Sequence, residues 1–204
     1  MLSAENKQKK KIEIMEKCFA CYCEKGLRNT GIKDLAKACD MTAPNFYSYF
    51  DNLDQLIVEC TQHGLIKIEN EYFSKAPKTK EDIVPYIEEV SDFNRTLRSA
   101  EYRFIYQVYT SPEFVEYGKK HRANQLARFR SYSEELEKEL NISWFFILSW
   151  IISFEQMLIQ YALFENATSF MIQKLSLKNM AHTLLAADKE VKLNPEAFKL
   201  PFDL

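Results

Sequence analysis

Cysteine and histidine are the side chains in this sequence that could hold a metal ion or exchange electrons. Cys18, Cys21 and Cys23 form a C-x-x-C-x-C motif, a spacing that suggests metal or redox chemistry. No second pair completes a zinc site, since Cys39 and Cys60 stand isolated in the sequence. The histidines are too scattered to form a ligand set: His63, His121 and His182. We therefore predict small buried thiols, with no metal and no cofactor.

Catalytic arrangements are equally hard to find. No nucleophile with a neighbouring base and no acid–base pair has a recognisable setting. The chain contains only 4 Gly and no G-x-G or G-x-x-x-x-G-K motif that could form a phosphate-binding loop. We therefore expect that the protein is not an enzyme. An odd number of cysteines, after a basic start without an apolar signal segment, predicts a cytoplasmic location.

The elements that carry the polar side chains are predicted to be helices throughout. A total of 4 Gly and 6 Pro is too few turn residues for a β-sandwich or barrel, and apolar residues recur at helical spacing. The predicted fold class is all-α, with a three-helix N-terminal domain over 6–66 and a larger helical domain over 67–204. The predicted helices cover 5–25, 32–39, 43–49, 53–74, 81–98, 101–109, 112–140, 143–165 and 169–187.

Two of these helices are short and lie very close together. Thr42 is a good N-cap for the second one, and Pro44 falls in its first turn, where a missing N–H group is tolerated. Asn52, with Gln55 three positions later, begins the next helix in the style of a capping box. Two short helices joined so tightly are typical of a helix-turn-helix unit.

Charge is distributed unevenly along the chain. The formal net charge is −2 overall, with +2 over residues 1–53 and −4 over the rest, which favours a polyanion as partner of the N-terminal part. Four lysines near the start form either an arm that contacts DNA or a solvated charge run without a role: Lys7, Lys9, Lys10 and Lys11. The most apolar stretch, 144–154, is shorter than the roughly 20 residues of a membrane span. We therefore predict a buried core helix there and no membrane association.

The stretch from Ile12 to Leu56 resembles the TetR family of bacterial transcription regulators, over about a quarter of the chain. Each matching residue is common alone, but the ordered set with uninterrupted spacing is fairly specific. The residues that carry the resemblance are Phe19, Tyr22, Gly26, Thr30, Ile32, Leu35, Ala36, Thr42, Asn45, Phe46, Tyr47, Tyr49, Phe50 and Leu56.

Two positions depart from the family pattern. The family usually has Gly in the turn between the second and third helices, where this chain has Asp40. Because Asp adopts the left-handed conformation more readily than most residues, we expect the turn to be kept. The family usually has Lys at the first position of the fourth helix, as a phosphate contact, and Leu53 replaces it here.

The resemblance implies that the helix 43–49 enters the major groove of DNA. Thr42 and Asn45 are then expected to hydrogen-bond to base edges, and Ala43 and Pro44 to contact thymine methyl groups. Core packing is expected for Phe46 and Phe50, and it stays open as an alternative for the two tyrosines. Phosphate contacts are expected from Arg28, Thr30, Lys33, Tyr47 and Tyr49, with Ser48 contacting either phosphates or bases.

The helix over 143–165 is apolar on most sides, so it must be covered from several directions. The resemblance implies that this helix and the helix 169–187 pair with their symmetry mates in a homodimer. A single deep core in a monomer is the alternative. A dimer would bind a pseudo-palindromic site in double-stranded DNA, because its two reading units are related by twofold symmetry.

The resemblance also implies a pocket for a small-molecule inducer in the C-terminal domain. Tyrosine combines an apolar ring with a polar tip, which suits a mostly apolar ligand that must be oriented. Core filling is the alternative for each aromatic residue. The candidate ligand-binding residues are Tyr86, Phe93, Tyr102, Tyr106 and Tyr109.

The sequence therefore predicts a DNA-binding transcriptional regulator, a repressor that a small and mostly apolar ligand releases from its operator. A helical ligand- or protein-binding module that kept the fold and lost DNA recognition stays open as a second hypothesis. Leu53 and the near-neutral net charge of −2 motivate it.

Overall fold

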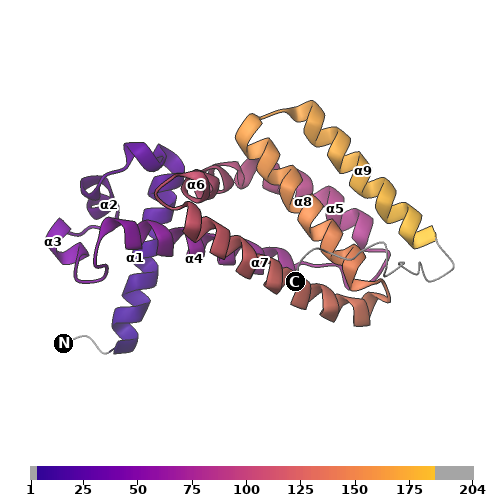
Figure 1. Ribbon diagram of the computed structural model, residues 1–204, viewed down its shortest axis with the longest axis horizontal. Coiled ribbons are helices and arrows are strands. Elements are labelled where there is room, and N and C mark those ends of the chain that lie inside the picture. The colour runs from indigo at the N-terminus through magenta and orange to yellow at the C-terminus, as the bar shows by residue number, and fades with distance from the viewer. Residues whose placement is uncertain (1–3, 187–204) are drawn as a thin grey trace. The chain divides into compact units, whose positions relative to one another are not determined.

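The computed structural model describes residues 4–186 of the chain. This part contains nine α-helices, one short 3₁₀ turn and no strand, so the all-α prediction is confirmed. Figure 1 shows the helices in chain order. Residue 187, the predicted end of the last helix, and the rest of the predicted domain up to 204 lie outside the described residues.

The N-terminal helices follow the predicted bounds with one exception. They are α1 (Ala4–Lys25), α2 (Ile32–Ala38), α3 (Ala43–Phe46) and α4 (Leu53–Ser74), with the 3₁₀ turn η1 (Leu27–Asn29) after α1. The prediction of a helix over 43–49 is too long, because the N–H groups of Ser48 and Tyr49 bond to carbonyls only three residues earlier. The chain therefore leaves α3 through tighter turns before α4 begins.

The remaining helices also lie where the apolar spacing predicts them, to within a few residues at each end. They are α5 (Ile83–Leu97), α6 (Ser99–Thr110), α7 (Val115–Leu140), α8 (Trp144–Phe164) and α9 (Ala167–Ala186). At the start of α9, the Asn166 side chain accepts a hydrogen bond of 2.9 Å from the N–H of Ser169 and acts as the cap.

The first of two compact units runs up to Lys75 and also includes Leu97–Arg122. Its core lies between α1, α4 and α6. The ring of Phe104 on α6 stacks on Tyr22 at 4.8 Å and meets Phe19 edge-on at 5.5 Å. Gly64 on α4 leaves the room for the Phe19 ring, since a Cβ there would lie 2.3 Å from it. Thus α6 completes the core that α1 and α4 form.

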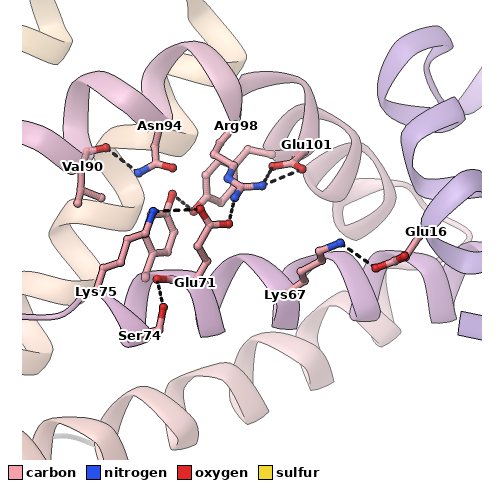
Figure 2. A network of polar contacts seen from close by, with 11 residues as sticks. Glu16, Lys67, Glu71, Ser74, Lys75, Val90, Asn94, Arg98 and Glu101 are labelled. Carbon is pink, nitrogen blue, oxygen red and sulfur yellow. Dashed lines mark hydrogen bonds and ion pairs between the residues drawn. The ribbon is translucent and has the colours of Figure 1, made fainter. Parts of the chain in front are cut away.

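Polar contacts at the edge of this unit connect the same helices. Figure 2 shows Arg98 between Glu71 of α4 and Glu101 of α6, with 2.7 Å from Arg98 Nη1 to Glu101 Oε2. Lys67 of α4 also forms a 2.7 Å ion pair with Glu16 of α1. Both α1 and α6 are therefore tied to α4 by charge as well as by apolar packing.

The second unit comprises Ala76–Thr96 and the chain from Ala123 onward. Ion pairs join α5 to α9 across its surface, and α8 and α9 lie side by side (Figure 1), with Tyr161 and Phe170 in edge-on contact at 5.3 Å. Its buried apolar cluster draws on helices far apart in the sequence: Ile83, Ile87, Leu136, Leu140, Ile142, Ile147 and Ala181.

Within the described residues, α8 alone is long and apolar enough to cross a membrane by length and composition. It also carries a buried carboxylate, because Glu155 accepts a 2.6 Å hydrogen bond from Gln125 of α7. Only 39% of its most apolar window is buried inside one chain. One side of α8 is therefore buried, as expected of a core helix. The other side leaves apolar surface uncovered within one chain.

Candidate nucleic-acid interface

The turn between α2 and α3 is built around a left-handed residue. Asp40 has a φ of 54°, which confirms that Asp takes the conformation expected at this position. The N–H of Met41 then bonds to the Ala36 carbonyl at 2.9 Å and closes the end of α2. The chain can therefore reverse and begin α3 within a few residues.

The start of α2 is fixed by one carboxylate. Asp34 Oδ2 accepts the N–H of the N-cap residue Gly31 at 3.1 Å, and Asp34 Oδ1 pairs with Lys25 at 2.6 Å. The hydrogen bond from Lys25, followed by that from Gly31, lowers the pKa of the Asp34 carboxyl below its ordinary value. This negative charge at the helix start also suits the helix dipole. Asp34 therefore joins α2 to the end of α1.

The recognition segment, residues 42–49, is anchored by aromatic rings on one side only. Phe46 and Phe50 are 1% and 2% exposed, with ring centres 5.5 Å apart, so the prediction that both belong to the core is confirmed. Thr42 takes the N-cap position of α3 as predicted, although its side chain makes no capping hydrogen bond. Because the anchors face inward, the other side chains of the segment are turned outward.

The outward side chains include most of the predicted base contacts. Four residues of the recognition segment are exposed along with Tyr47, whose side chain is 47% exposed, while Ala43 and Tyr49 are half-buried. Ser48 uses its hydroxyl proton locally, donating to the Asn45 carbonyl at 2.6 Å. The exposed four are Thr42, Pro44, Asn45 and Ser48. The segment thus presents amide, hydroxyl and phenol groups to solvent.

Three predicted phosphate contacts lie outside the recognition segment. Arg28 and Lys33 are exposed, near the start of α2. Thr30 is only 6% exposed and donates its hydroxyl proton to the Gly26 carbonyl at 2.8 Å. Since Gly31 is the N-cap of α2, Thr30 stands one residue before the cap. Because the phosphate oxygens only accept hydrogen bonds and the Thr30 hydroxyl proton is donated to Gly26, the predicted contact with phosphate is left to the backbone N–H group.

The helix that follows the recognition segment begins with the predicted cap. Asn52 accepts the N–H of Gln55 at 2.8 Å, and Gln55 Oε1 accepts the N–H of Asp51 at 2.6 Å. In a regular capping box the side chain at this position would accept the N–H of the cap residue itself. Here Gln55 accepts the N–H of Asp51, one residue before the cap. Leu53 is half-buried at the first position of α4.

The first lysines of the chain lie on a helix instead of an extended arm, because α1 begins at Ala4. These residues therefore do not form a mobile arm, in agreement with the helix predicted over 5–25, and their contact with DNA stays a prediction. Helix periodicity places Lys7, Lys10 and Lys11 on one face of α1 and Lys9 on the opposite face.

Cys39 and Cys60, which are isolated in the sequence, lie close to the thiols of α1 in the fold. Cys18 Sγ and Cys39 Sγ lie 3.6 Å apart in the core, and Cys60 donates to the Met15 carbonyl at 3.5 Å nearby on α4. The hydrogen bond with Cys18 and burial raise the pKa of the Cys39 thiol, so it stays protonated. Within residues 4–186 no group of His, Cys, Asp or Glu is placed to hold a metal ion. These thiols act as small apolar side chains.

The five predicted ligand-binding residues divide between the two units. Tyr102 and Tyr109 are buried on α6 and Tyr106 is half-buried there, all in the first unit. Tyr86 is half-buried and Phe93 is 47% exposed on α5, in the second unit. The Tyr102 hydroxyl lies 3.3 Å from that of Tyr72 on α4. The three tyrosines on α6 therefore belong to the same unit as the recognition segment.

Comparison with known families finds a match for the N-terminal helices. Residues 14–60 match the family model for bacterial regulatory proteins of the tetR family. The N-terminal segment is therefore similar to the tetR family. The matched segment begins within α1 and runs through α2 and α3 into the first part of α4, so it contains the recognition segment and both buried anchors, Phe46 and Phe50.

Solved structures with the TetR fold match most of the chain. One, described as a TetR-family transcriptional regulator from Mesorhizobium loti MAFF303099, has a TM-score of 0.66 at 14% identity and covers 88% of this chain and 96% of its own. A TetR transcription regulator from Haloarcula marismortui ATCC 43049 has a TM-score of 0.62 at 12% identity, with coverage of 87% and 98%.

A third similar structure contains a ligand. It is the transcriptional regulator FadR from Bacillus subtilis in complex with stearoyl-CoA, with a TM-score of 0.53 at 12% identity and coverage of 83% and 96%. At this identity the likeness shows the TetR fold alone. A search of curated proteins finds no match to this chain.

Proposed function

We propose that the protein is a cytoplasmic transcriptional regulator that binds double-stranded DNA through the recognition segment. The observation that supports this most directly is the orientation of residues 42–49: Phe46 and the adjoining Phe50 are buried, while Asn45 and Tyr47 face solvent. A helix with its side chains is about 10–12 Å wide and fits a major groove of about 12 Å. A segment whose polar side chains are exposed in this way can reach base edges without unfolding.

Each residue of the proposed interface has a role that follows from its chemistry. The Asn45 amide can donate to and accept from adenine at once, and Thr42 offers a hydroxyl beside it. Ala43 and Pro44 are apolar and suit thymine methyl groups. Hydroxyl groups and cations are proposed to contact the phosphates. Such contacts position the protein on DNA without reading its sequence. This phosphate-binding group consists of Arg28, Thr30, Lys33, Tyr47, Ser48 and Tyr49.

The protein acts as a homodimer in this proposal. The end of α8 and the helix α9 expose several large apolar side chains, and large exposed apolar patches mark interaction surfaces. A twofold pair would place two recognition segments one DNA turn apart, about 34–36 Å, on a pseudo-palindromic site. The exposed apolar residues are Leu163, Phe164, Met171, Ile172, Leu175 and Met180.

A small, mostly apolar ligand releases the repressor from its operator in this proposal. The recognition segment is followed directly by α4, and Arg98 and the Tyr72–Tyr102 contact tie α4 to α6. A ligand that prefers one packing of the α6 tyrosines would therefore shift α4 and the recognition segment with it. Such a ligand acts only through a difference in affinity between the two states.

DNA binding is tested by a gel shift on the region upstream of the protein's own gene. Asn45→Ala removes the proposed adenine contact, and we expect the affinity to fall by roughly 10-fold or more, as for one bidentate base contact per protomer. Asn70→Ala makes the same chemical change at an exposed position of α4 away from the segment and should leave binding unchanged.

The outcome separates the two hypotheses for this fold. Wild-type protein that binds its own upstream region no better than random DNA at low salt would favour the module without DNA recognition. The ligand is tested in the same assay with a panel of apolar small molecules that includes a long-chain acyl-CoA, chosen because of the ligand in the Bacillus subtilis structure. Release of the bound DNA is the expected result, and unchanged binding with every compound contradicts ligand control by this class.

A further inference from the structure

The start of α1 reaches the end of the recognition segment. The Lys7 ammonium lies 5.9 Å from the centre of the Tyr49 ring, within the range of a cation–π contact. Tyr49 is half-buried and follows directly on the exposed residues of the segment, while Lys7 is exposed. A cation from α1 and an aromatic ring from the turn after α3 thus meet at the edge of the proposed DNA surface.

Ion pairing distinguishes Lys7 from the other lysines of α1. Each of the others has a carboxylate within reach, which cancels its charge locally. The pairs are Lys9–Glu5 at 2.8 Å, Lys10–Glu13 at 2.8 Å, Lys11–Glu59 at 2.6 Å, Lys17–Glu13 at 3.3 Å and Lys25–Asp34 at 2.6 Å. Among the described contacts of the α1 lysines, Lys7 is the one that faces an aromatic ring in place of a carboxylate. Its positive charge is therefore available to an anion.

We propose that Lys7 and Tyr49 together bind one backbone phosphate of double-stranded DNA in each protomer. The ammonium supplies a charge-assisted hydrogen bond and the phenol hydroxyl a neutral one. The ring beneath the ammonium restricts the lysine side chain, which lowers the entropy lost when the phosphate is bound. This phosphate site rests on the proposed DNA-binding function, and it places the start of α1 on the DNA backbone beside the recognition segment.

The salt dependence of DNA affinity tests this phosphate site. Fluorescence anisotropy on the operator-containing fragment, at several KCl concentrations, gives the slope of log affinity against log salt for each variant. Each phosphate contact contributes about 0.9 to that slope, so Lys7→Gln should reduce its magnitude by about 1.8 in a dimer. Lys9→Gln is the matched control, since it removes the same charge two positions away, on the opposite side of the helix.

A double variant tests whether both groups grip the same phosphate. If they do, Lys7→Gln combined with Tyr49→Phe should lose less affinity than the two single losses together. Equal slopes for Lys7→Gln, Lys9→Gln and wild type, in a wild-type protein that binds its operator, would overturn this phosphate site alone. Full additivity of the two losses would overturn the shared phosphate. Absence of specific binding by wild type would remove the proposed function, and this inference with it.

Discussion

At the scale of single residues, Asp40 shows how a local conformation supports the recognition turn. Its φ of 54° lies in the left-handed region, where most L-residues are strained and Asp and Asn less so. Its side chain is 90% exposed and lies 3.7 Å from Lys17, a contact that contributes little to stability. The backbone conformation is therefore the main constraint on which residue this position accepts.

Substitutions at Asp40 should separate conformation from charge. Asp40→Gly relieves strain but increases the freedom of the unfolded chain, so the free energy of unfolding should stay within about 1 kcal/mol of wild type. Asp40→Val removes the same charge and forces a β-branched residue into the left-handed region, which should cost about 1–2 kcal/mol. Urea unfolding followed by circular dichroism measures both. Equal stabilities of the Gly and Val variants would show that the turn does not depend on this φ.

At the scale of elements, charged pairs hold α9 against α5. Lys174 is 6% exposed and lies 3.0 Å from Asp92 and 3.6 Å from Glu88, and Lys178 also pairs with Glu88. The hydrogen bond from Lys178, followed by the charge of Lys174, lowers the pKa of the Glu88 carboxyl below its ordinary value of 4.5. The buried Lys174 ammonium depends on these carboxylates, because an unpaired buried charge is costly.

The lowered pKa of Glu88 predicts a pH-dependent contribution to stability. A carboxyl that is more acidic in the folded state stabilises the fold above its unfolded pKa and loses this effect as the pH falls through the folded value. The difference in unfolding free energy between wild type and Glu88→Gln should therefore be constant from about pH 7 to pH 5 and shrink at lower pH. Since the Glu88 side chain is about half exposed, we expect about 1 kcal/mol or less at neutral pH.

Thermal or urea unfolding across that pH range measures this difference. Glu89→Gln provides the control, because Glu89 is the exposed neighbour on the same helix and its loss should not produce the same acid dependence. A wild-type minus Glu88→Gln difference that grows toward acid pH would contradict the predicted role.

At the scale of the whole molecule, the apolar surface of α8 and α9 is the feature that one chain leaves uncovered. Phe164 is 71% exposed, Ile172 64% and Leu175 57%. Removing such side chains from water contributes roughly 25 cal/mol for each Å² that is buried. A second copy of the chain, turned about a twofold axis, would cover the same surface on both protomers.

Charge introduced into this surface should separate the protomers. We expect wild type to have twice the chain mass of 24.0 kDa, and Ile172→Glu combined with Leu175→Glu to have the single-chain mass. The reason is that two carboxylates per protomer would have to be buried at the centre of the interface. Size-exclusion chromatography with light scattering measures the mass.

Asn124→Glu, at an exposed position of α7, is the control and should remain a dimer. A wild-type protein that is monomeric at micromolar concentration would contradict the proposed dimer. So would a double-glutamate variant that keeps the mass of two chains.

Much of the fold was determined by the sequence over short distances. The bounds of α4, the cap at Asn52 and the left-handed turn at Asp40 depend on residues within about four positions, so apolar spacing and capping patterns are sufficient to predict them. The burial of Phe46 and Phe50 follows from their spacing in the same way. The end of α3 was predicted too late, because hydrogen bonds to the fourth or third preceding carbonyl leave the same apolar pattern.

Only the tertiary structure decided the contacts between residues far apart in the chain. The packing of Phe104 on Tyr22, the approach of Cys18 to Cys39 and the pairing of Lys11 with Glu59 leave no periodic trace in the sequence. The same holds for Lys7, whose charge is distinguished from its neighbours by what folding places beside each lysine. A side chain's chemistry is set by its type, but its available charge is set by its neighbours in space, and long-range packing determines those neighbours.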